Sequence, residues 1–325
     1  MKAHGGIMTR EDLKRYVARW RDPVEFSYRG HTVISMPPSS SGGLTLALIA
    51  NILQGYNLRA LGWHSPEHLH LVAEAMRRAF ADRNALLADA DFHPVPRAQF
   101  LSRAYAARER ATIDSLKATP SAQIRPGLGM AVTHLHTTHF GVVDAKGDAV
   151  GITYTLNNSY GSGVTVTGAG FLMNDEMDDF AAKPGSPNMF GLVQLEANAI
   201  QPGKRPLSAM TPTIVLDRQG KVKLVVGTPG GPTIITQVYH VISNVIDHGM
   251  SLADAVAAPR LHHQALPDSI QLERGGFLPA VMDSLRAMGH AIKFGGGGDV
   301  QAIIRTRNGW QGVSDPRGGG MPSGY

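Results

Sequence analysis

The sequence contains no cysteine, which excludes disulfide bonds, thiolate metal sites and a cysteine nucleophile. Long apolar runs are also missing, because the longest one, residues 44–53, contains Thr45 and Asn51 and is too short to span a bilayer. The first residues, MKAHGGIMTREDL, have no apolar region of the signal-peptide type. The net charge is only +5, without a basic block or zinc-finger spacing. We therefore expect neither nucleic acid nor a membrane as a partner.

The remaining composition is that of a folded protein. Of the 325 residues, 43% are hydrophobic and 18% are charged, which is too apolar for a disordered chain. A chain of this length can bury a substantial core. Glycine is abundant, with 37 residues, or about 11% against a usual 7% or so. This composition favours a glycine-rich globular enzyme.

The first 120 or so residues are predicted to be mostly helical from the spacing of their apolar side chains. Helices are expected over residues 9–20, with Thr9 as the N-cap, and over residues 44–53 and 66–81. A short strand is expected at residues 32–35.

From about residue 137 the apolar period changes from 3.6 to 2, which is typical of strands. Two strands are predicted at residues 137–144 and 149–155, joined by a tight turn. The other elements expected in this region are strands at 212–216, 221–226 and 301–305 and helices at 234–246 and 279–288. Helices followed by strands, without strict alternation, predict an α+β fold with a helix-covered antiparallel sheet.

The hairpin predicted over residues 137–155 fixes which residues face each other across its two strands. A three-residue turn with Gly147 in the left-handed conformation places Thr137 opposite Thr155 and His139 opposite Thr153. Cross-strand neighbours have Cβ atoms about 5 Å apart. Two hydroxyl groups are therefore expected side by side, either as an ordinary cross-strand threonine pair or as part of a site.

The two faces of this hairpin differ in polarity. The face with the threonines is small and polar, whereas the other face carries large apolar side chains that we expect to be buried in the core. These apolar residues are Phe140, Val142, Val150, Ile152 and Tyr154.

A glycine-rich segment, GTPGGPT at residues 227–233, lies between a predicted strand and a predicted helix. Gly230 and Gly231 allow close approach of the backbone to a ligand, and N–H groups at a helix start suit an oxyanion or a carboxylate. Pro232 fits the first helical turn. A nucleotide P-loop is not indicated, because no Gly-Lys-Ser/Thr follows. A purely structural turn is the alternative.

An acidic cluster, NDEMDDF, occupies residues 174–180. Such carboxylates can hold an ammonium group, bind a cation or mark the start of a helix. The spacing is not that of a calcium loop, which needs a central glycine and a later glutamate.

Histidines cluster at His134, His136 and His139, and again at residues 262–263. The sequence contains no HExxH pattern, and its 14 histidines make chance clusters easy, so we expect no metal site. The absence of GxSxG also gives no support to an α/β-hydrolase serine.

Several of these segments resemble the γ-glutamyltranspeptidases, in the same order and at closely similar spacing. They are TTHF at 137–140, TYTLN at 153–157, MDDF at 177–180, RPLS at 205–208 and PGG at 229–231. Further matches are residues 37–43, 74–83, 258–260, 262–264 and 314–317, so the resemblance runs essentially from end to end.

The resemblance implies an N-terminal nucleophile hydrolase with a four-layer αββα sandwich, made as a precursor that cuts itself into two fragments. The matching bond here joins His136 to Thr137. Residues 1–136 then correspond to the C-terminal part of the large subunit and residues 137–325 to the small subunit, together forming one composite domain. Family members carry a long additional N-terminal half, so the sandwich in this chain is expected to be incomplete.

By the same resemblance, Thr137 is the nucleophile, and its freed α-amine is the general base. The Thr155 hydroxyl orients it, and the N–H groups of Gly230 and Gly231 form the oxyanion hole. The expected donor is a γ-glutamyl amide such as glutathione, and the acceptor is water, an amine or a peptide. No cofactor is implied.

The resemblance also assigns the donor-binding residues. Asn157, Glu176 and Asp179 are expected to bind the α-ammonium group of the donor. Ser208 is expected to contact its α-carboxylate, and Phe190 matches the aromatic gate of the bacterial lid loop.

Two departures from the family pattern leave alternatives open. Ala209 stands where the family usually has a second serine, and no residue matches the arginine that clamps the donor carboxylate in the N-terminal half. One alternative is an acylase for a glutaryl-type donor. The other is a non-catalytic truncated paralogue, or half of a split enzyme that needs a separately encoded N-terminal half. The family is mostly periplasmic or extracellular in bacteria, whereas this chain shows no export signal of its own.

Overall fold

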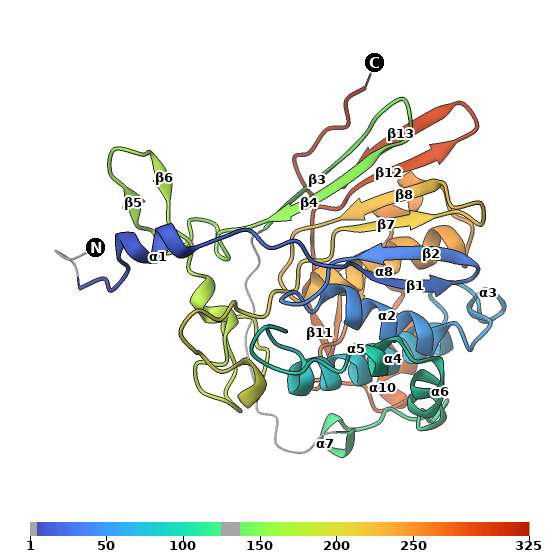
Figure 1. Cartoon of the computed structure of the whole chain (residues 1–325). Coiled ribbons are helices and arrows are strands. Elements are labelled where there is room, and N and C mark those ends of the chain that lie inside the picture. The colour runs from blue at the N-terminus through green and yellow to red at the C-terminus, as the bar shows by residue number, and fades with distance from the viewer. Residues whose placement is uncertain (1–4, 125–136, 325) are drawn as a thin grey trace.

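The computed structural model describes residues 5–124 and 137–324. Its centre is a six-stranded antiparallel sheet (Figure 1). In spatial order the strands are β1 (Val24–Tyr28), β2 (His31–Ser35), β7 (Thr213–Leu216), β8 (Val222–Gly227), β12 (Gln301–Thr306) and β13 (Gly309–Ser314). The sheet therefore combines strands from both sides of position 137, although β1 and β13 are not predicted from the sequence.

Helices cover one face of this sheet (Figure 1). The helix α2 (Gly42–Leu53) contacts β1 and β2, and α8 (Thr233–Ile246) contacts β8 and α2. Every residue of α2 is buried. Behind them, α4 (Pro66–Leu86) begins with Ser65 as N-cap and is buried over most of its length. The three predicted helices in these regions are thus confirmed.

The remaining elements are shorter. The other helices are α1 (Arg10–Arg15), α3 (Leu58–Leu61), α5 (Arg97–Leu101), α6 (Arg103–Ala111), α7 (Ser121–Ile124), α9 (Leu252–Ala257) and α10 (Pro279–Ala287), with 3-10 turns η2 (Glu176–Asp179) and η3 (Glu196–Asn198). The short strands are β5 (Thr165–Val166), β6 (Phe171–Leu172), β9 (Leu261–His262), β10 (Ile270–Leu272) and β11 (Ile292–Phe294).

The predicted hairpin is present as β3 (Thr138–Val143) and β4 (Ala149–Tyr154), and its register is confirmed, with His139 opposite Thr153. It lies against β7, β8 and β12. Glycine makes this approach possible, because a Cβ atom on Gly141 would lie only 3.1 Å from Val225 Cγ1. The small polar face of the hairpin is therefore the one that packs on the sheet.

The expectation that the apolar face of the hairpin is buried is wrong. Its five large side chains are 39–58% exposed, namely Phe140, Val142, Val150, Ile152 and Tyr154. Alternation of polar and apolar residues along a strand separates two faces but does not show which face is covered. Here the face with small side chains packs on the sheet, because it allows the closer contact between sheets. The described residues thus form helices, a six-stranded sheet and a hairpin layer with an apolar outer face.

The N-terminal helix is shorter than predicted. It ends at Arg15 rather than near residue 20, although Thr9 is the N-cap as predicted and forms a capping box with Asp12. None of its residues is buried, and Trp20 beyond it is fully exposed. Figure 1 shows α1 projecting from the main body on the same side as β5 and β6.

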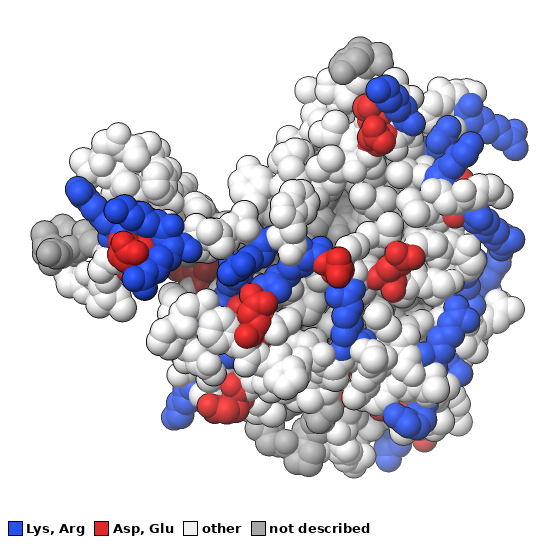
Figure 2. Space-filling model, viewed as in Figure 1, with Lys and Arg blue, Asp and Glu red and all other residues white. Residues whose placement is uncertain are grey.

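Charge on the visible face is mixed, with Lys and Arg interspersed with Asp and Glu (Figure 2). In the described part of the chain, no helix combines the length and apolar character needed to cross a membrane.

Candidate functional site

Most of the predicted site residues line one small cavity. Those that line it are Thr137, Thr155, Asn157, Asp179, Phe190, Ser208 and Gly231. They are joined there by Arg83, Leu192, Leu207, Ala209, Met210, Pro232 and Ile234. Of the other predicted residues, Gly230 directly precedes Gly231, and Glu176 lies in the same 3-10 turn as Asp179. His136, and with it the predicted cleavage bond, lies outside the described residues.

The two threonines lie at the open end of the hairpin. Thr137 directly precedes β3 and Thr155 directly follows β4, so the register that pairs His139 with Thr153 brings both into the cavity. Thr155 Oγ1 accepts a hydrogen bond of 2.8 Å from the Asn157 backbone N–H. Asn157 has a φ of +74°, a conformation that asparagine tolerates better than most residues. The chain thus turns sharply and places the Asn157 side chain in the cavity wall.

His139 connects the hairpin to the glycine-rich loop. Its Nδ1 lies 2.8 Å from Thr153 Oγ1, and burial lowers its pKa to about 4, so the ring is neutral at pH 7. The ring packs on Gly227, where a Cβ atom would lie 2.3 Å from it. Among the described residues no three His, Asp or Glu side chains are grouped to hold a metal ion. His134 is outside that part of the chain.

The glycine-rich loop has backbone conformations that require glycine. Gly230 has a φ of +143° and Gly231 a φ of +53°, directly before the buried helix α8. A Cβ atom on Gly230 would lie 2.6 Å from Thr233 Oγ1 and 2.7 Å from Gln237 Nε2. The loop therefore has room for its backbone and for no side chain at this position.

Gln237, in α8, supports this loop through hydrogen bonds and was not predicted from the sequence. Its Nε2 donates to Thr233 Oγ1 at 2.7 Å, and its Oε1 accepts from Thr228 Oγ1 at 3.1 Å and from Arg260 Nη1 at 3.3 Å. The side chain is buried. A glutamine four residues after a threonine on a helix is a weak signal, and only the fold shows what surrounds it.

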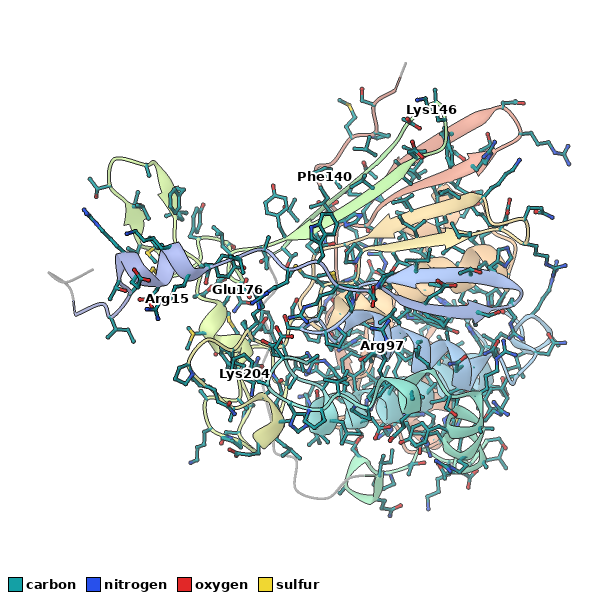
Figure 3. The ribbon with its side chains drawn as sticks, in the orientation of Figure 1. Arg15, Arg97, Phe140, Lys146, Glu176 and Lys204 are labelled. Atoms are coloured by element: carbon teal, nitrogen blue, oxygen red, sulfur yellow. The ribbon has the colours of Figure 1, made fainter. Side chains whose placement is uncertain are left out.

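The acidic residues approach the cavity from η2. Asp179 lines it, and the carboxyl group of Glu176, from the same turn, interacts with that of Asp179. Figure 3 places Glu176 below the end of the hairpin, away from the six-stranded sheet. Burial raises the pKa of Glu176 to about 7, and burial together with Glu176 raises the pKa of Asp179 well above its usual range. Burial and the neighbouring carboxyl group therefore favour the protonated form of Asp179.

Ser208 is held by the serine-rich segment 39–41. Its carbonyl accepts hydrogen bonds from the Ser41 N–H at 2.8 Å and the Ser41 hydroxyl at 2.7 Å, and its N–H donates to the Ser39 carbonyl at 3.0 Å. Its Oγ accepts from the Met210 N–H at 3.0 Å. The adjacent Ala209 also lines the cavity, without a polar atom on its side chain.

Phe190 forms part of the cavity wall and is only 4% exposed. Its N–H donates to Asn188 Oδ1 at 3.0 Å, and its carbonyl accepts from Gln264 Nε2 at 3.0 Å. Asp178 also holds this segment, because its Oδ2 accepts from the Met189 N–H at 2.9 Å. These hydrogen bonds hold the segment around Phe190 in place at the cavity wall.

Arg83 is a second residue that the sequence did not assign. It comes from the C-terminal end of α4 and is fully buried at the cavity. Burial lowers its pKa to about 10, and the nearby Asp179 opposes that shift. This wall of the cavity therefore holds a buried cation and a buried acid, a combination that is typical of functional sites.

Comparisons with known proteins agree along the whole chain. The family model for gamma-glutamyltranspeptidase matches residues 1–325. The glutathione hydrolase proenzyme of Pseudomonas sp. (strain A14) is 47% identical over 100% of this chain and 55% of its own length, and that of Escherichia coli (strain K12) is 45% identical over 98% and 55%. Among solved structures, cephalosporin acylase from Bacillus halodurans is 26% identical with a TM-score of 0.81, covering 97% of this chain and 55% of the other. The chain therefore spans about half the length of the curated relatives it matches.

Proposed function

Because the chain belongs to the gamma-glutamyltranspeptidase family, we propose that it carries the catalytic centre of an enzyme for γ-glutamyl transfer or hydrolysis. The proposed donors are glutathione and related γ-glutamyl amides, and the acceptors are water, amines or peptides. The observation that supports this most strongly is the single cavity that gathers Thr137, Asp179 and Ser208 from distant parts of the sequence.

In the proposed mechanism the bond between His136 and Thr137 is cut first, through attack of the Thr137 hydroxyl on the preceding carbonyl and hydrolysis of the resulting ester. The α-amine of Thr137 is then free to accept the proton of its own hydroxyl. That hydroxyl attacks the γ-carbonyl of the donor, an amine leaves with a proton, and water or an acceptor amine resolves the acyl-enzyme. The fragments 1–136 and 137–325 are proposed to stay together, since both contribute strands to the six-stranded sheet.

The surroundings of Thr137 suit this chemistry. Thr155, its cross-strand neighbour, is proposed to orient the nucleophile through a hydrogen bond. The N–H groups of Gly230 and Gly231 are proposed to stabilise the oxyanion, at the start of a helix whose dipole favours negative charge. One such donor in a serine protease is worth about 3 kcal/mol of transition-state stabilisation.

Donor recognition is assigned to the opposite side of the cavity. Asn157, Glu176 and Asp179 are proposed to receive the α-ammonium group and Ser208 the α-carboxylate. Phe190 is proposed to cover the bound donor from the loop. The excess of carboxyl groups favours a γ-glutamyl donor over a glutaryl one, because a glutaryl group brings no ammonium to pair with them.

Hydrolysis of γ-glutamyl-p-nitroanilide by the purified protein tests this proposal. Thr137→Ala is expected to lower kcat by about 10³-fold or more, since it removes the nucleophile and the cleavage site together. The matched control is Thr138→Ala, which changes the adjacent exposed threonine and is expected to keep most of the activity. Equal activity of wild type and Thr137→Ala would contradict the proposal. Preferred hydrolysis of glutaryl-p-nitroanilide would instead support the acylase alternative, which Ala209 favours.

A second candidate role is supported by the exposed outer face of the hairpin. Five large apolar side chains on two neighbouring strands form a patch of the kind that another layer usually covers. A chain that works only beside a separate half, or that is not catalytic, accounts for this patch. In that case the purified chain alone shows no hydrolysis. The wild-type chain is also expected to bind an apolar dye strongly, and the double variant Val150→Lys, Ile152→Lys is expected to lose this binding.

A further inference from the structure

Arg83 occupies a special position in the cavity wall. Its side chain is 0% exposed, and it lies near the C-terminal end of α4. Its Nε donates to Ser41 Oγ at 2.9 Å, and its Nη1 donates to Asn84 Oδ1 at 2.9 Å. Neither of these partners is charged, so the guanidinium is not neutralised by a direct ion pair within the described residues.

One end of this guanidinium is free within the described part of the chain. Nη2 is buried without a hydrogen-bond partner there, although the residue lines the cavity that also holds Asp179. A buried cation with an unsatisfied N–H is costly unless a negative group lies near it. Asp179 is the acidic group that opposes the lowering of the Arg83 pKa by burial.

Arg83 is also connected to Ser208 by two hydrogen bonds through the Ser41 hydroxyl. Because the Ser41 hydroxyl accepts a hydrogen bond from Arg83 Nε, its own proton is directed to the Ser208 carbonyl, 2.7 Å away. Arg83 is therefore placed between the two groups expected to hold the charged ends of the donor.

We propose that Arg83 is a positioning residue of the donor site. Its guanidinium is linked to Ser208 through Ser41 on one side and shares the cavity with Asp179 on the other, so that it fixes one donor-binding group and places a positive charge near the other. This inference rests on the proposed function.

The charges around Asp179 explain why the cation matters. Glu176 and Asp178, both from η2, disfavour ionisation of Asp179, and Asp175 acts on Glu176 in the same sense. Arg83, from α4, is the cation that favours the ionised form of Asp179. Without it, burial and the neighbouring acids keep Asp179 protonated over a wider pH range, and a neutral acid pairs poorly with an ammonium group.

The test compares Arg83→Met and Arg83→Lys with wild type. For γ-glutamyl-p-nitroanilide, Arg83→Met is expected to raise KM at pH 7 by about tenfold or more and to move the acid limb of kcat/KM up by about one pH unit. Arg83→Lys, which keeps the charge, is expected to restore much of both. The matched control is Arg78→Met, on the same helix and equally buried, where the arginine pairs with Glu74 at 2.5 Å and does not line the cavity. It is expected to lower Tm and to leave the pH profile unchanged.

A second readout does not depend on activity. The carboxyl carbon signal of Asp179, identified by its loss in Asp179→Asn, is followed against pH in ¹³C-labelled protein. A higher Asp179 pKa in Arg83→Met than in wild type supports the inference even if wild type hydrolyses no γ-glutamyl amide, an outcome that rejects only the proposed function. If Arg83→Met is folded and Asp179 titrates as in wild type, the inference is overturned, whether or not hydrolysis proceeds.

Discussion

At the scale of single residues, Ala209 is a departure from the family pattern that lies in the cavity wall itself. Ser208 offers a hydroxyl, and the next residue, Ala209, offers only a methyl group against the same cavity. A donor carboxylate has several hydrogen-bond acceptor sites, so one hydroxyl leaves part of that capacity unused. Hydrogen bonds to charged groups are worth about 1.5–3 kcal/mol.

Ala209→Ser is therefore expected to lower KM for γ-glutamyl-p-nitroanilide by about tenfold, with little change in kcat. The control is Ala181→Ser, which adds the same hydroxyl at a buried position outside the cavity. Steady-state kinetics of the two variants check this prediction. An unchanged or higher KM in Ala209→Ser would show that the donor carboxylate does not reach this position.

The site residues that the sequence predicts lie within short motifs, such as Thr137 in TTHF and Ser208 in RPLS. Arg83 and Gln237 were missed, because their importance comes from packing between elements far apart in the chain. Arg83 lies 54 positions before the proposed nucleophile, and nothing in its own helix distinguishes it from Arg77 or Arg78.

At the scale of elements, the glycine-rich loop at residues 227–233 gives the most specific prediction. Gly230→Ala is expected to lower kcat by about 10²-fold, because its methyl group meets Thr233 and Gln237 and displaces the proposed oxyanion donors. The control is Gly220→Ala, at a φ of +77° with no atom within 4 Å of the added Cβ. That change strains the backbone without a steric clash, so it lowers Tm slightly and leaves kcat intact. Equal kcat values for the two variants would contradict the assignment of the loop.

The hairpin shows both the strength and the limit of sequence patterns. The turn residues and the period of two predicted the pairing of His139 with Thr153, which the structure confirms. The burial of its faces was predicted the wrong way round, because the partner of a strand face lies elsewhere in the chain. The strand β1 was not predicted for the same reason, because its alternating burial depends on the helix α2 that packs against it. At the N-terminus, apolar spacing predicted a longer helix than α1, whose side chains find no buried contact.

At the scale of the whole molecule, buried histidines link stability to pH. Burial lowers the pKa of seven of them to about 3 or 4, namely His64, His68, His139, His240, His262, His263 and His290. Their unfolded pKa is near 6.5, so between that value and about 4 the unfolded chain binds more protons than the folded one. Stability is then lost as the pH falls. The raised pKa values of Glu176, Asp179 and Asp299 act in the opposite sense, but within the described residues these are three groups against the seven histidines.

The Tm is accordingly expected to fall by about 10 °C or more between pH 7.5 and pH 5.5. Differential scanning calorimetry at constant ionic strength measures this directly. A Tm that is constant or rises over this range would show that the histidines are not held neutral by burial.

The central claim of the proposed function is that Thr137 is a nucleophile released by self-cleavage. The measurement that tests it most directly is the intact mass of the purified protein after incubation, beside a Thr137→Ala control. Cleavage before Thr137 divides the 325 residues into 136 and 189. The predicted result is two fragments of about 15 kDa and about 20 kDa, in proportion to the 34.8 kDa chain, and an uncut control. A single 34.8 kDa species in both samples, or identical cleavage in the control, would contradict the claim.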